Sequence, residues 1–245
     1  MHYLCRPQFA CGLSYPLQTD VIIPAFNEAL SIGRVLRDIP KEWVREVIVV
    51  DNGSTDQTSQ EAKAHGATVL NQPKKGYGNA CLKGMAYLEA KPSGDQPDVV
   101  VFLDGDYSDY PEELSKLVAP IARDEADFVL GSRTLGKRKR GSMMPQQLFG
   151  NWLSTHLILL LFGTRFTDLG PFRAIRFPSL LALGMIDRNY GWTVEMQIKA
   201  LKKGLRWQEV PVSYRPRIGH SKVSGTLRGT VGAGYKIITT ILKYR

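Results

Sequence analysis

The chain has 245 residues, of which 43% are hydrophobic and 22% charged, so its composition excludes an extended disordered protein and allows one large domain with a substantial core. Its net charge of +9 is unevenly placed: residues 1–130 hold 12 lysines and arginines against 19 aspartates and glutamates, and residues 131–245 hold 20 against 4. The second half therefore suits an anionic partner, and because no known nucleic-acid-binding motif is present, we expect phosphorylated ligands or an acidic membrane surface rather than nucleic acid.

The cysteines and the apolar runs bear on cellular location. Cys5, Cys11 and Cys81 are an odd number without metal-site spacing, as expected for reduced thiols in the cytoplasm. The first twenty residues lack the continuous apolar region of a signal peptide. The longest apolar-dominated run, residues 152–162, would make a helix about 16 Å long, whereas the hydrocarbon core of a bilayer is about 30 Å thick. This run is therefore too short to cross a membrane.

Strands and helices are predicted to alternate along the first half of the chain, after an N-terminal extension over residues 1–19. The predicted strands are short apolar runs at residues 20–25, 46–51, 67–70, 99–103 and 127–130. A helix is predicted after each of the first four, which indicates an α/β fold with a mainly parallel sheet flanked by helices. After Leu135 we expect an apolar helix over residues 152–162, a short strand near residues 208–212, and an amphipathic C-terminal segment over residues 226–245.

Three of these strands end in acidic residues. Asp104 and Asp106 follow the buried run of residues 99–103. Glu28 follows the first strand, and Asp51 ends the second. The carboxyl ends of parallel strands meet at one edge of a sheet, where ligands bind, and two carboxylates one residue apart suit Mg²⁺ or Mn²⁺ shared with a diphosphate. Taken alone, the acidic pair is more simply explained as a turn.

Three ordered sequence blocks strengthen this interpretation. They are Val21-Ile22-Ile23-Pro24-Ala25-Phe26-Asn27-Glu28, Val49-Val50-Asp51-Asn52-Gly53-Ser54-Thr55-Asp56 and Leu103-Asp104-Gly105-Asp106. Together they resemble the family-2 glycosyltransferases of the GT-A fold, and within them the dolichyl- and polyprenyl-phosphate sugar synthases. The resemblance implies a nucleotide-diphosphate sugar donor, a divalent Mg²⁺ or Mn²⁺ ion and inversion at the anomeric carbon. It also implies one GT-A domain over residues 20–225, with a nucleotide-sugar half (20–133) and an acceptor half (134–225).

The resemblance implies roles for residues in the nucleotide-sugar half. Pro24, Phe26 and Glu28 would line the nucleoside pocket. Asp51 would hold the base or ribose, and the loop from Lys75 to Asn79 would close over the nucleotide.

The acidic pair has the metal-binding role in this family. By the resemblance, Asp104 would lie near the ribose and metal, and Asp106 would ligate the metal, which neutralises charge as the nucleoside diphosphate departs. Asp109 is a weaker candidate, because it is well placed to cap the helix that begins at Pro111.

Basic residues of the second half are candidates to contact phosphate, since a guanidinium group pairs bidentately with phosphate oxygens. Arg133 and Arg173 stand where the family carries arginine. The other candidates are Arg215, Arg217 and Lys222. The alternative is a solvated basic face, and for residues 137–140 we favour that, or a loose attraction to a membrane, over a catalytic role.

Glu195 is an acidic residue one turn into a predicted helix of the basic half. It could be the general base for an acceptor hydroxyl, or an ion-pair partner that orients one of the arginines. A lipid phosphate is already ionised and needs no base. Hydroxyl-glycosylating relatives often carry an acidic pair here, which this sequence lacks, so we expect a lipid-phosphate acceptor with Glu195 as an orienting residue.

Two apolar segments of the second half suggest membrane contact. The helix over residues 152–162 is either buried against the sheet or embedded in a membrane interface. In the C-terminal segment, Ile237, Ile238, Ile241 and Leu242 share one helical face, flanked by basic residues, as in an interfacial anchor.

The expected activity is transfer of a hexose, from a UDP-glucose or GDP-mannose type of donor, to polyprenyl or dolichyl phosphate. We expect a cytoplasmic protein, peripheral on the cytosolic membrane face. The alternatives are transfer to a hydroxyl of another lipid or small molecule, and a non-catalytic nucleotide-sugar-binding module.

Overall fold

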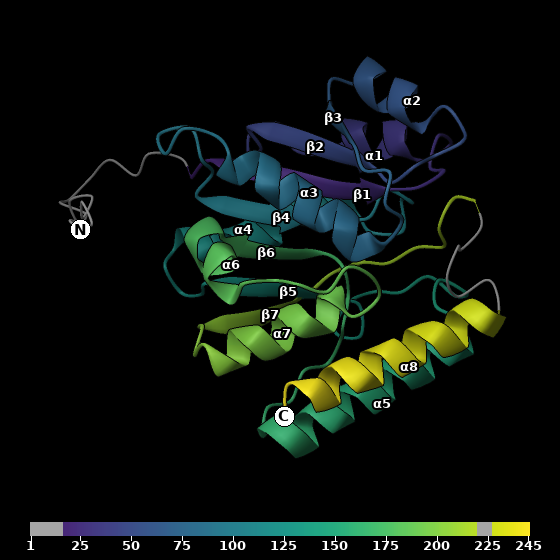
Figure 1. Cartoon of the computed structure of the whole chain (residues 1–245), viewed down its shortest axis with the longest axis vertical. Helices are drawn as coiled ribbons and strands as arrows, with labels where there is room; N and C mark the ends of the chain where they lie inside the picture. The colour runs from purple at the N-terminus through teal and green to yellow at the C-terminus, as the bar shows by residue number, and fades with distance from the viewer. Residues whose placement is uncertain (1–16, 220–226) are drawn as a thin grey trace.

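The computed structural model describes residues 17–219 and 227–245 (Figure 1). Most of the predicted extension over residues 1–19 lies outside the described residues, as do Cys5 and Cys11.

A seven-stranded sheet runs through the molecule. Its strands are β1 (Thr19–Ala25), β2 (Glu46–Asp51), β3 (Thr68–Asn71), β4 (Val99–Phe102), β5 (Phe128–Ser132), β6 (Arg173–Arg176) and β7 (Trp207–Pro211). They lie in the order β3-β2-β1-β4-β6-β5-β7. Strand β6 is antiparallel to β4 and β5, and the other paired strands are parallel. The predicted α/β fold with a mainly parallel sheet is confirmed.

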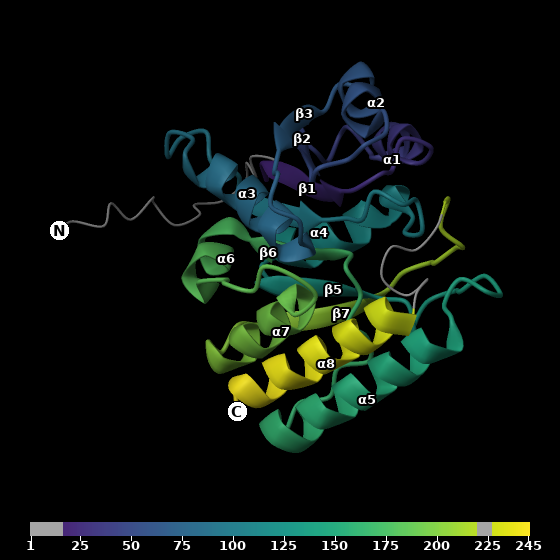
Figure 2. The same cartoon turned by 45° about the vertical axis from the view of Figure 1, so that its right-hand side comes forward.

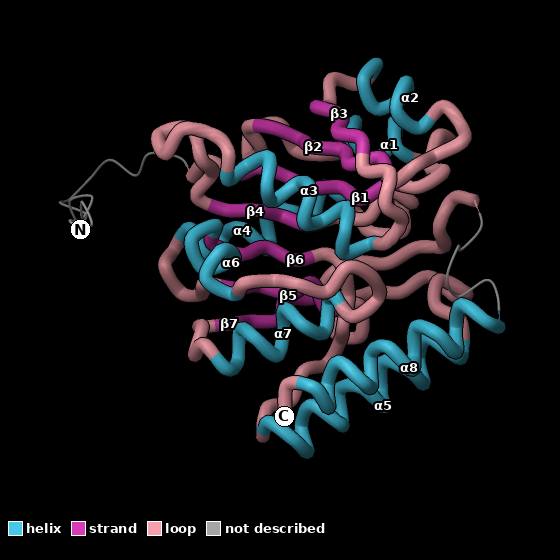
Figure 3. Tube along the Cα trace, in the orientation of Figure 1, coloured by secondary structure: helices cyan, strands magenta, loops and turns pink. Residues whose placement is uncertain are grey.

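Helices cover both faces of this sheet (Figures 1 and 3). They are α1 (Ile32–Asp38), α2 (Thr58–Ala64), α3 (Tyr77–Glu89), α4 (Leu114–Ala122), α5 (Pro145–Phe162), α6 (Phe177–Leu183), α7 (Trp192–Lys202) and α8 (Leu227–Lys243), with a 3₁₀ turn at Pro111–Glu113. The predicted C-terminal amphipathic segment forms α8.

The strands are apolar on both sides because each side faces a separate core. In β1, Ile22 packs into the core beneath α3, α6 and α7, whereas Val21 and Ile23 pack into the core beneath α1 and α4. In β4, Val100 and Val101 divide between the two cores in the same way. This alternation follows from the two-residue period of a strand, and it explains the continuous apolar runs in the sequence.

Two elements of the second half were not predicted. Strand β6 has the sequence Arg-Ala-Ile-Arg, whose two arginines conceal its burial, and it inserts between β4 and β5. Helix α6 follows it directly. Both are short, so neither gives a clear periodic signal.

Helices α5 and α8 lie side by side below the sheet (Figures 1 and 2). The apolar residues Phe149, Trp152 and Leu160 of α5 are 62%, 53% and 78% exposed, whereas Ser154 and Thr155 are buried. The interpretation of this helix as buried holds for one face only: Ile158 is fully buried and Leu157, Leu161 and Phe162 pack against the core, whereas Phe149, Trp152 and Leu160 face solvent. In the part of the chain that the structure describes, no helix has the length and apolarity needed to cross a membrane.

Candidate active site

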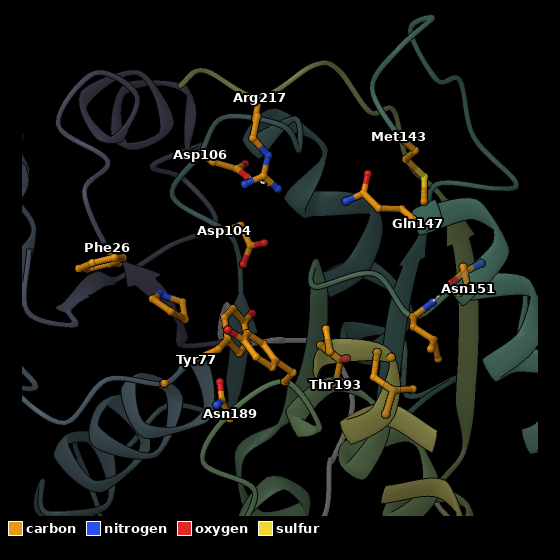
Figure 4. Close-up of a pocket in the computed structure, with 18 of the residues that line it drawn as sticks. Phe26, Tyr77, Asp104, Asp106, Met143, Gln147, Asn151, Asn189, Thr193 and Arg217 are labelled. Atoms are coloured by element: carbon orange, nitrogen blue, oxygen red, sulfur yellow. Dashed lines mark hydrogen bonds and ion pairs between the residues drawn. The ribbon is translucent and has the colours of Figure 1, made fainter. Parts of the chain in front are cut away.

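A cavity of about 840 Å³ opens at the carboxyl ends of β1 and β4 (Figure 4). From β1 the chain moves outward to β2 and β3, and then returns to β4 on the other side of β1. Such a reversal leaves a crevice between the two strands, which is where ligands bind in open α/β sheets. The topology therefore explains why the residues after β1 and β4 line the cavity.

Asp104 lies at the centre of this cavity wall, two residues beyond the end of β4 (Figure 4). Its Oδ1 atom is buried and has no hydrogen-bond partner among the described residues. Burial, reinforced by the nearby Asp106 carboxylate, raises the pKa of Asp104 to about 7. A buried oxygen without a partner beside a second carboxylate is a position that a cation would stabilise.

Asp106 also lines the cavity and is 4% exposed. One carboxylate oxygen accepts hydrogen bonds from the backbone N–H and hydroxyl of Ser108, at 2.9 and 2.5 Å. The other forms a 2.9 Å ion pair with Arg217, which lines the cavity as expected for a phosphate-binding residue. The next residue, Tyr107, has a φ of 63°, an unfavourable value for a side chain of this size, so the turn is held by its surroundings.

Arg215, which was expected to contact phosphate, stabilises the turn at Tyr107. Its Nε donates to the carbonyl of Tyr107 at 2.7 Å, and one Nη donates to the carbonyl of Asp109 at 3.1 Å. The guanidinium group stacks on the ring of Tyr107, 3.4 Å from its centroid. The structure therefore places Arg215 behind Asp106, as a support for the turn rather than a phosphate ligand.

Asp104 and Asp106 could together hold a divalent cation. The described residues contain no cluster of three or more metal-ligating side chains. Mg²⁺ is commonly bound by one or two carboxylates, with substrate phosphates and water completing its octahedron, so two carboxylates beside an open cavity fit that pattern. Their neighbour Arg217 already supplies positive charge at Asp106.

Four expected nucleotide-binding residues line the cavity: Pro24, Phe26, Glu28 and Lys75. The Lys75 ammonium lies 4.8 Å from the centroid of the Phe26 ring. The ammonium lies over one face of the ring, and an aromatic side chain beside a cation suits a base and a phosphate.

Asn52 also lines the cavity, and the sequence interpretation missed it. Its side chain donates to the carbonyls of Gln72 and Lys74, at 2.9 and 2.7 Å, and accepts a bond from the N–H of Gly76 at 2.7 Å. Asn52 therefore fixes the loop before α3. The signal that could have revealed it is its position directly after β2.

The structure places two expected nucleotide contacts, Asp51 and Asn79, elsewhere. The Asp51 carboxylate accepts bonds from the N–H of Ser54 at 2.8 Å and from the hydroxyl of Ser59, so it stabilises its own turn. Asn79 lies in the first turn of α3 and donates to the carbonyl of Lys75 at 3.0 Å. Neither lines the cavity, because the strand and the helix direct them into local bonds.

Arg133 follows β5 and lines the cavity, as expected. Its Nε and one Nη donate to the two carboxylate oxygens of Asp168, each at 2.7 Å, and its backbone N–H donates to the same carboxylate at 2.8 Å. Burial by itself would lower the pKa of Arg133, but the Asp168 carboxylate holds this pKa well above its usual range. Asp168 is fully buried. The sequence did not reveal it as the partner of Arg133, because 35 residues separate the two along the chain.

Arg173 does not line the cavity, contrary to the expectation that it contacts phosphate. It is fully buried in β6 and donates to backbone carbonyls, that of Thr193 at 2.9 Å and that of Gly170. Burial lowers its pKa to about 10. Its role in this geometry is to support the segment around residues 169–170.

Glu195 is also fully buried and outside the cavity wall. Its carboxylate accepts bonds from the N–H of Asp187 and the hydroxyl of Tyr244, each at 2.7 Å, and pairs with Lys199 at 2.7 Å. The expected roles as a base or as the partner of an arginine therefore do not match its contacts. It instead fixes the segment before Asn189, a residue of the cavity wall, to the C-terminal end of the chain.

Two further expectations concern Asp109 and Lys222. Asp109 does not cap the following helix: the first residue outside that helix is Tyr110, and no side chain caps it. Both carboxylate oxygens of Asp109 are buried without a partner among the described residues, and burial raises its pKa well above the usual range. The prediction of a cap was wrong. Lys222 lies outside the described residues.

The cavity continues away from the carboxylates to the space between α5 and α8. Its walls there are mainly apolar, and include Phe149, Leu153, Ile237 and Ile238. Polar side chains border the junction with the carboxylate end, among them Gln147, Asn151 and Thr193 (Figure 4). One end of the cavity is therefore polar and charged, and the other is apolar.

The fold is similar to that of glucosyl-3-phosphoglycerate synthase from Mycobacterium tuberculosis. Its structure in complex with Mn²⁺, uridine diphosphate and glucosyl-3-phosphoglycerate matches with a TM-score of 0.73 and 22% sequence identity, covering 99% of this chain and 86% of that one. At this identity the likeness concerns the fold, and it agrees with the predicted GT-A architecture.

The sequence itself is similar to several glycosyltransferases. An uncharacterized glycosyltransferase of Mycobacterium tuberculosis is 36% identical over 219 residues, covering 86% of this chain and 92% of the relative. A dolichyl-phosphate hexose transferase of Haloferax volcanii is 32% identical, covering 92% and 94%, and an undecaprenyl-phosphate mannosyltransferase of Micrococcus luteus is 30% identical, covering 85% and 88%. The model of the family described as "Glycosyl transferase family 2" matches residues 20–184. The chain therefore belongs to glycosyl transferase family 2.

Proposed function

We propose that this glycosyltransferase moves a hexose from a nucleotide-diphosphate sugar, of the UDP-glucose or GDP-mannose type, to polyprenyl or dolichyl phosphate, with inversion. The observation that carries the proposal is the continuity of one cavity from the charged strand ends to the apolar space between α5 and α8. A sugar nucleotide matches the first environment, and a lipid phosphate matches the second. In this proposal the donor is bound mainly by residues of the 20–133 half together with Arg217, and the acceptor by Arg133 together with α5 and α8.

The donor would lie at the polar end of the cavity. Phe26 offers a face for the base, and Lys75 and Arg217 supply positive charge for the diphosphate. Asp104 and Asp106 would hold Mg²⁺ or Mn²⁺, which would offset the charge of the departing nucleoside diphosphate. The unpartnered oxygen of Asp104 supports this assignment.

The acceptor phosphate would lie near Arg133, with its lipid tail between α5 and α8. Asp168 holds the guanidinium of Arg133 in a fixed orientation, so that little entropy is lost when an anion binds. An acceptor oxygen forms the new bond to the anomeric carbon from the side opposite the breaking bond to the diphosphate. This step needs no base, because a phosphate monoester is already ionised.

The set of carboxylates in the cavity also favours a phosphate acceptor. Among the described residues, the carboxylates that line the cavity are Glu28, Asp104 and Asp106, all at the donor end. Glu195 has its oxygens occupied by backbone N–H groups, Lys199 and Tyr244. A hydroxyl acceptor would lack a base at the apolar end. Two relatives, the undecaprenyl-phosphate mannosyltransferase of Micrococcus luteus and the dolichyl-phosphate hexose transferase of Haloferax volcanii, are named for polyprenyl-phosphate acceptors, which supports the same choice.

Attachment to the cytosolic face of a membrane is part of this proposal. A polyprenyl acceptor resides in a bilayer, and the exposed Phe149, Trp152 and Leu160 of α5 provide an apolar surface that an interface would bury.

A second candidate function is transfer to a hydroxyl of a phosphorylated small molecule. It is favoured by the fold similarity to glucosyl-3-phosphoglycerate synthase, whose solved complexes contain phosphoglyceric acid. The third, a nucleotide-sugar-binding module without catalysis, predicts donor binding without any product.

One assay separates the three functions. The protein is incubated with Mn²⁺, radiolabelled UDP-glucose or GDP-mannose, and one acceptor: a short-chain polyprenyl phosphate, the matching polyprenol, or 3-phosphoglycerate. We expect product with the polyprenyl phosphate alone, released by mild acid and stable to alkali, as a glycosyl phosphate should be. Product from the polyprenol or 3-phosphoglycerate instead would contradict the proposal, and donor binding without product would support the binding module. Asp106→Asn should abolish transfer, whereas the exposed Asp95→Asn serves as a control of the same chemistry.

A further inference from the structure

We infer that a second cavity, on the other side of α5, binds the phosphodiester headgroup of an anionic membrane lipid. The inference rests on the membrane attachment included in the proposed function, and it names the site and the ligand. The cavity measures about 330 Å³ and lies between α5 and the loops at residues 134–138 and 165–167. Of the described residues, only Asn151 lines both this cavity and the first cavity, at the carboxyl ends of β1 and β4.

The charge of this cavity suits an anion. Arg138 and Arg165 line it from two different loops, and no aspartate or glutamate is among its lining residues. Neither arginine forms an ion pair within residues 17–219 or with the described part of α8. Two uncompensated guanidinium groups facing one hollow favour a phosphate, whose oxygens accept bidentate hydrogen bonds.

Hydroxyl and imidazole groups form the rest of the polar lining of the cavity. The hydroxyl of Thr134 donates to the carbonyl of Thr167 at 3.0 Å, and the hydroxyls of Thr134 and Thr167 meet that of Ser132 at 2.9 and 2.6 Å, so these hydroxyl hydrogens are used within the protein. His156 lines it too, and its Nδ1–H donates to the carbonyl of Trp152 at 2.7 Å, so Nε2 of the neutral ring is an acceptor. The groups of this cavity that attract a phosphate are therefore its two arginines.

The rim of the cavity favours a lipid over free phosphate. Leu135, Leu148, Trp152 and Leu159 line it and are 52%, 38%, 53% and 39% exposed. Three of them lie on α5, the helix that also exposes Phe149. Free phosphate gains nothing from such a rim, whereas the glycerol and upper acyl carbons of a lipid would bury it. Tryptophan is moreover a side chain favoured at the level of lipid headgroups.

The site is also connected to the groups proposed to bind the acceptor. Thr134 and Thr167 are the chain neighbours of Arg133 and Asp168. Asn151 donates to the carbonyl of Thr167 at 3.1 Å and accepts from the N–H of Leu169 at 2.9 Å, so it fixes the segment that carries Asp168. A headgroup in this cavity would therefore hold α5 at the membrane with the acceptor end of the first cavity beside the lipid.

The test measures binding to vesicles without donor or acceptor. Full-length protein is sedimented with phosphatidylcholine vesicles that do or do not contain phosphatidylglycerol, and compared with Arg138→Ala/Arg165→Ala. The matched control is Lys137→Ala/Lys139→Ala, which removes the same charge from exposed residues of the loop that carries Arg138 and that do not line the cavity. General attraction to an anionic surface is worth about fivefold per basic residue, so it would weaken both variants alike by roughly 25-fold. We expect the arginine pair to lose at least tenfold more affinity than the lysine pair, for the anionic vesicles only.

Equal losses in the two pairs, or binding of neutral vesicles as tight as of anionic ones, would overturn the inference. A second measurement separates the lipid from its phosphate: a short-chain phosphatidylglycerol below its micelle concentration should raise the Tm of the wild type but not of the arginine variant. The same shift with inorganic phosphate would overturn the assignment to a lipid. Because neither measurement involves sugar transfer, failure of the proposed reaction would leave these results unchanged, and their failure would leave the transfer assay unaffected.

Discussion

Replacing Asp168 by asparagine should destabilise the protein strongly. Asp168 is fully buried and accepts hydrogen bonds from three nitrogen atoms of Arg133 and from the N–H of Leu169. Arg133 is only 12% exposed, so a neutral partner would leave a guanidinium charge almost without solvent. Breaking a buried pair in this way costs about 3–5 kcal/mol. For a chain of this size, that predicts a Tm lower by roughly 6–20 °C.

The assay is thermal unfolding at neutral pH, with transfer activity measured below both melting temperatures. The control is Glu125→Gln, which removes a carboxylate from the pair with Arg123, where the side chains are 44% and 59% exposed. We expect no measurable change in the Tm of this control, because exposed pairs contribute little. Equal melting temperatures for the two variants would refute the reasoning. If Arg133 acts on the acceptor, the asparagine variant should also raise the KM for the acceptor more than that for the donor.

Three further results are expected. Burial raises the pKa of Asp109, so this group stabilises the fold at acidic pH and that stability is lost as the pH rises; Asp109→Asn should therefore be more stable than the wild type at pH 8 by about 1–3 kcal/mol in urea denaturation, with the difference vanishing near pH 4. Because burial and Asp106 raise the pKa of Asp104 to about 7, the affinity for Mn²⁺ should increase steadily from about pH 6 to pH 8 in calorimetric titrations, and a flat profile would contradict the metal assignment. Glu195→Gln should lower the Tm, because a buried carboxylate with four partners is lost, yet retain most of its kcat below the Tm; a loss of a thousandfold or more, as for a missing base, would contradict its structural role.

Much of the site could be predicted because strand ends are visible in a sequence. A buried strand is a short apolar run, and the polar residue that follows it must lie at the edge of the sheet. Glu28, Asp104 and Asp106 stood out in this way, and all three line the cavity. Phe26, Lys75 and Arg133 were expected there from the family resemblance, and they line it too.

The charge of a residue predicted its place in the site less well than a strand end did. Arg173 was expected to contact phosphate because the family carries arginine there, and Glu195 was singled out as a lone acid in a basic half, yet both are fully buried. Arg173 binds backbone carbonyls, and Glu195 binds backbone N–H groups, Lys199 and Tyr244. A sequence shows that a residue is charged, but the burial that determines its partners depends on elements distant along the chain.

The sequence by itself determined the alternation of strands and helices, the carboxylates at the ends of β1 and β4, and the basic character of the second half. These properties depend on local periodicity and on residue type. Only the tertiary structure decided that β6 inserts antiparallel between β4 and β5, that Asp168 is the partner of Arg133, and that the cavity at the ends of β1 and β4 extends between α5 and α8. The physical reason is that each of these depends on packing between segments far apart in sequence, and the free energy of such contacts is set by the assembled fold and not by any local pattern.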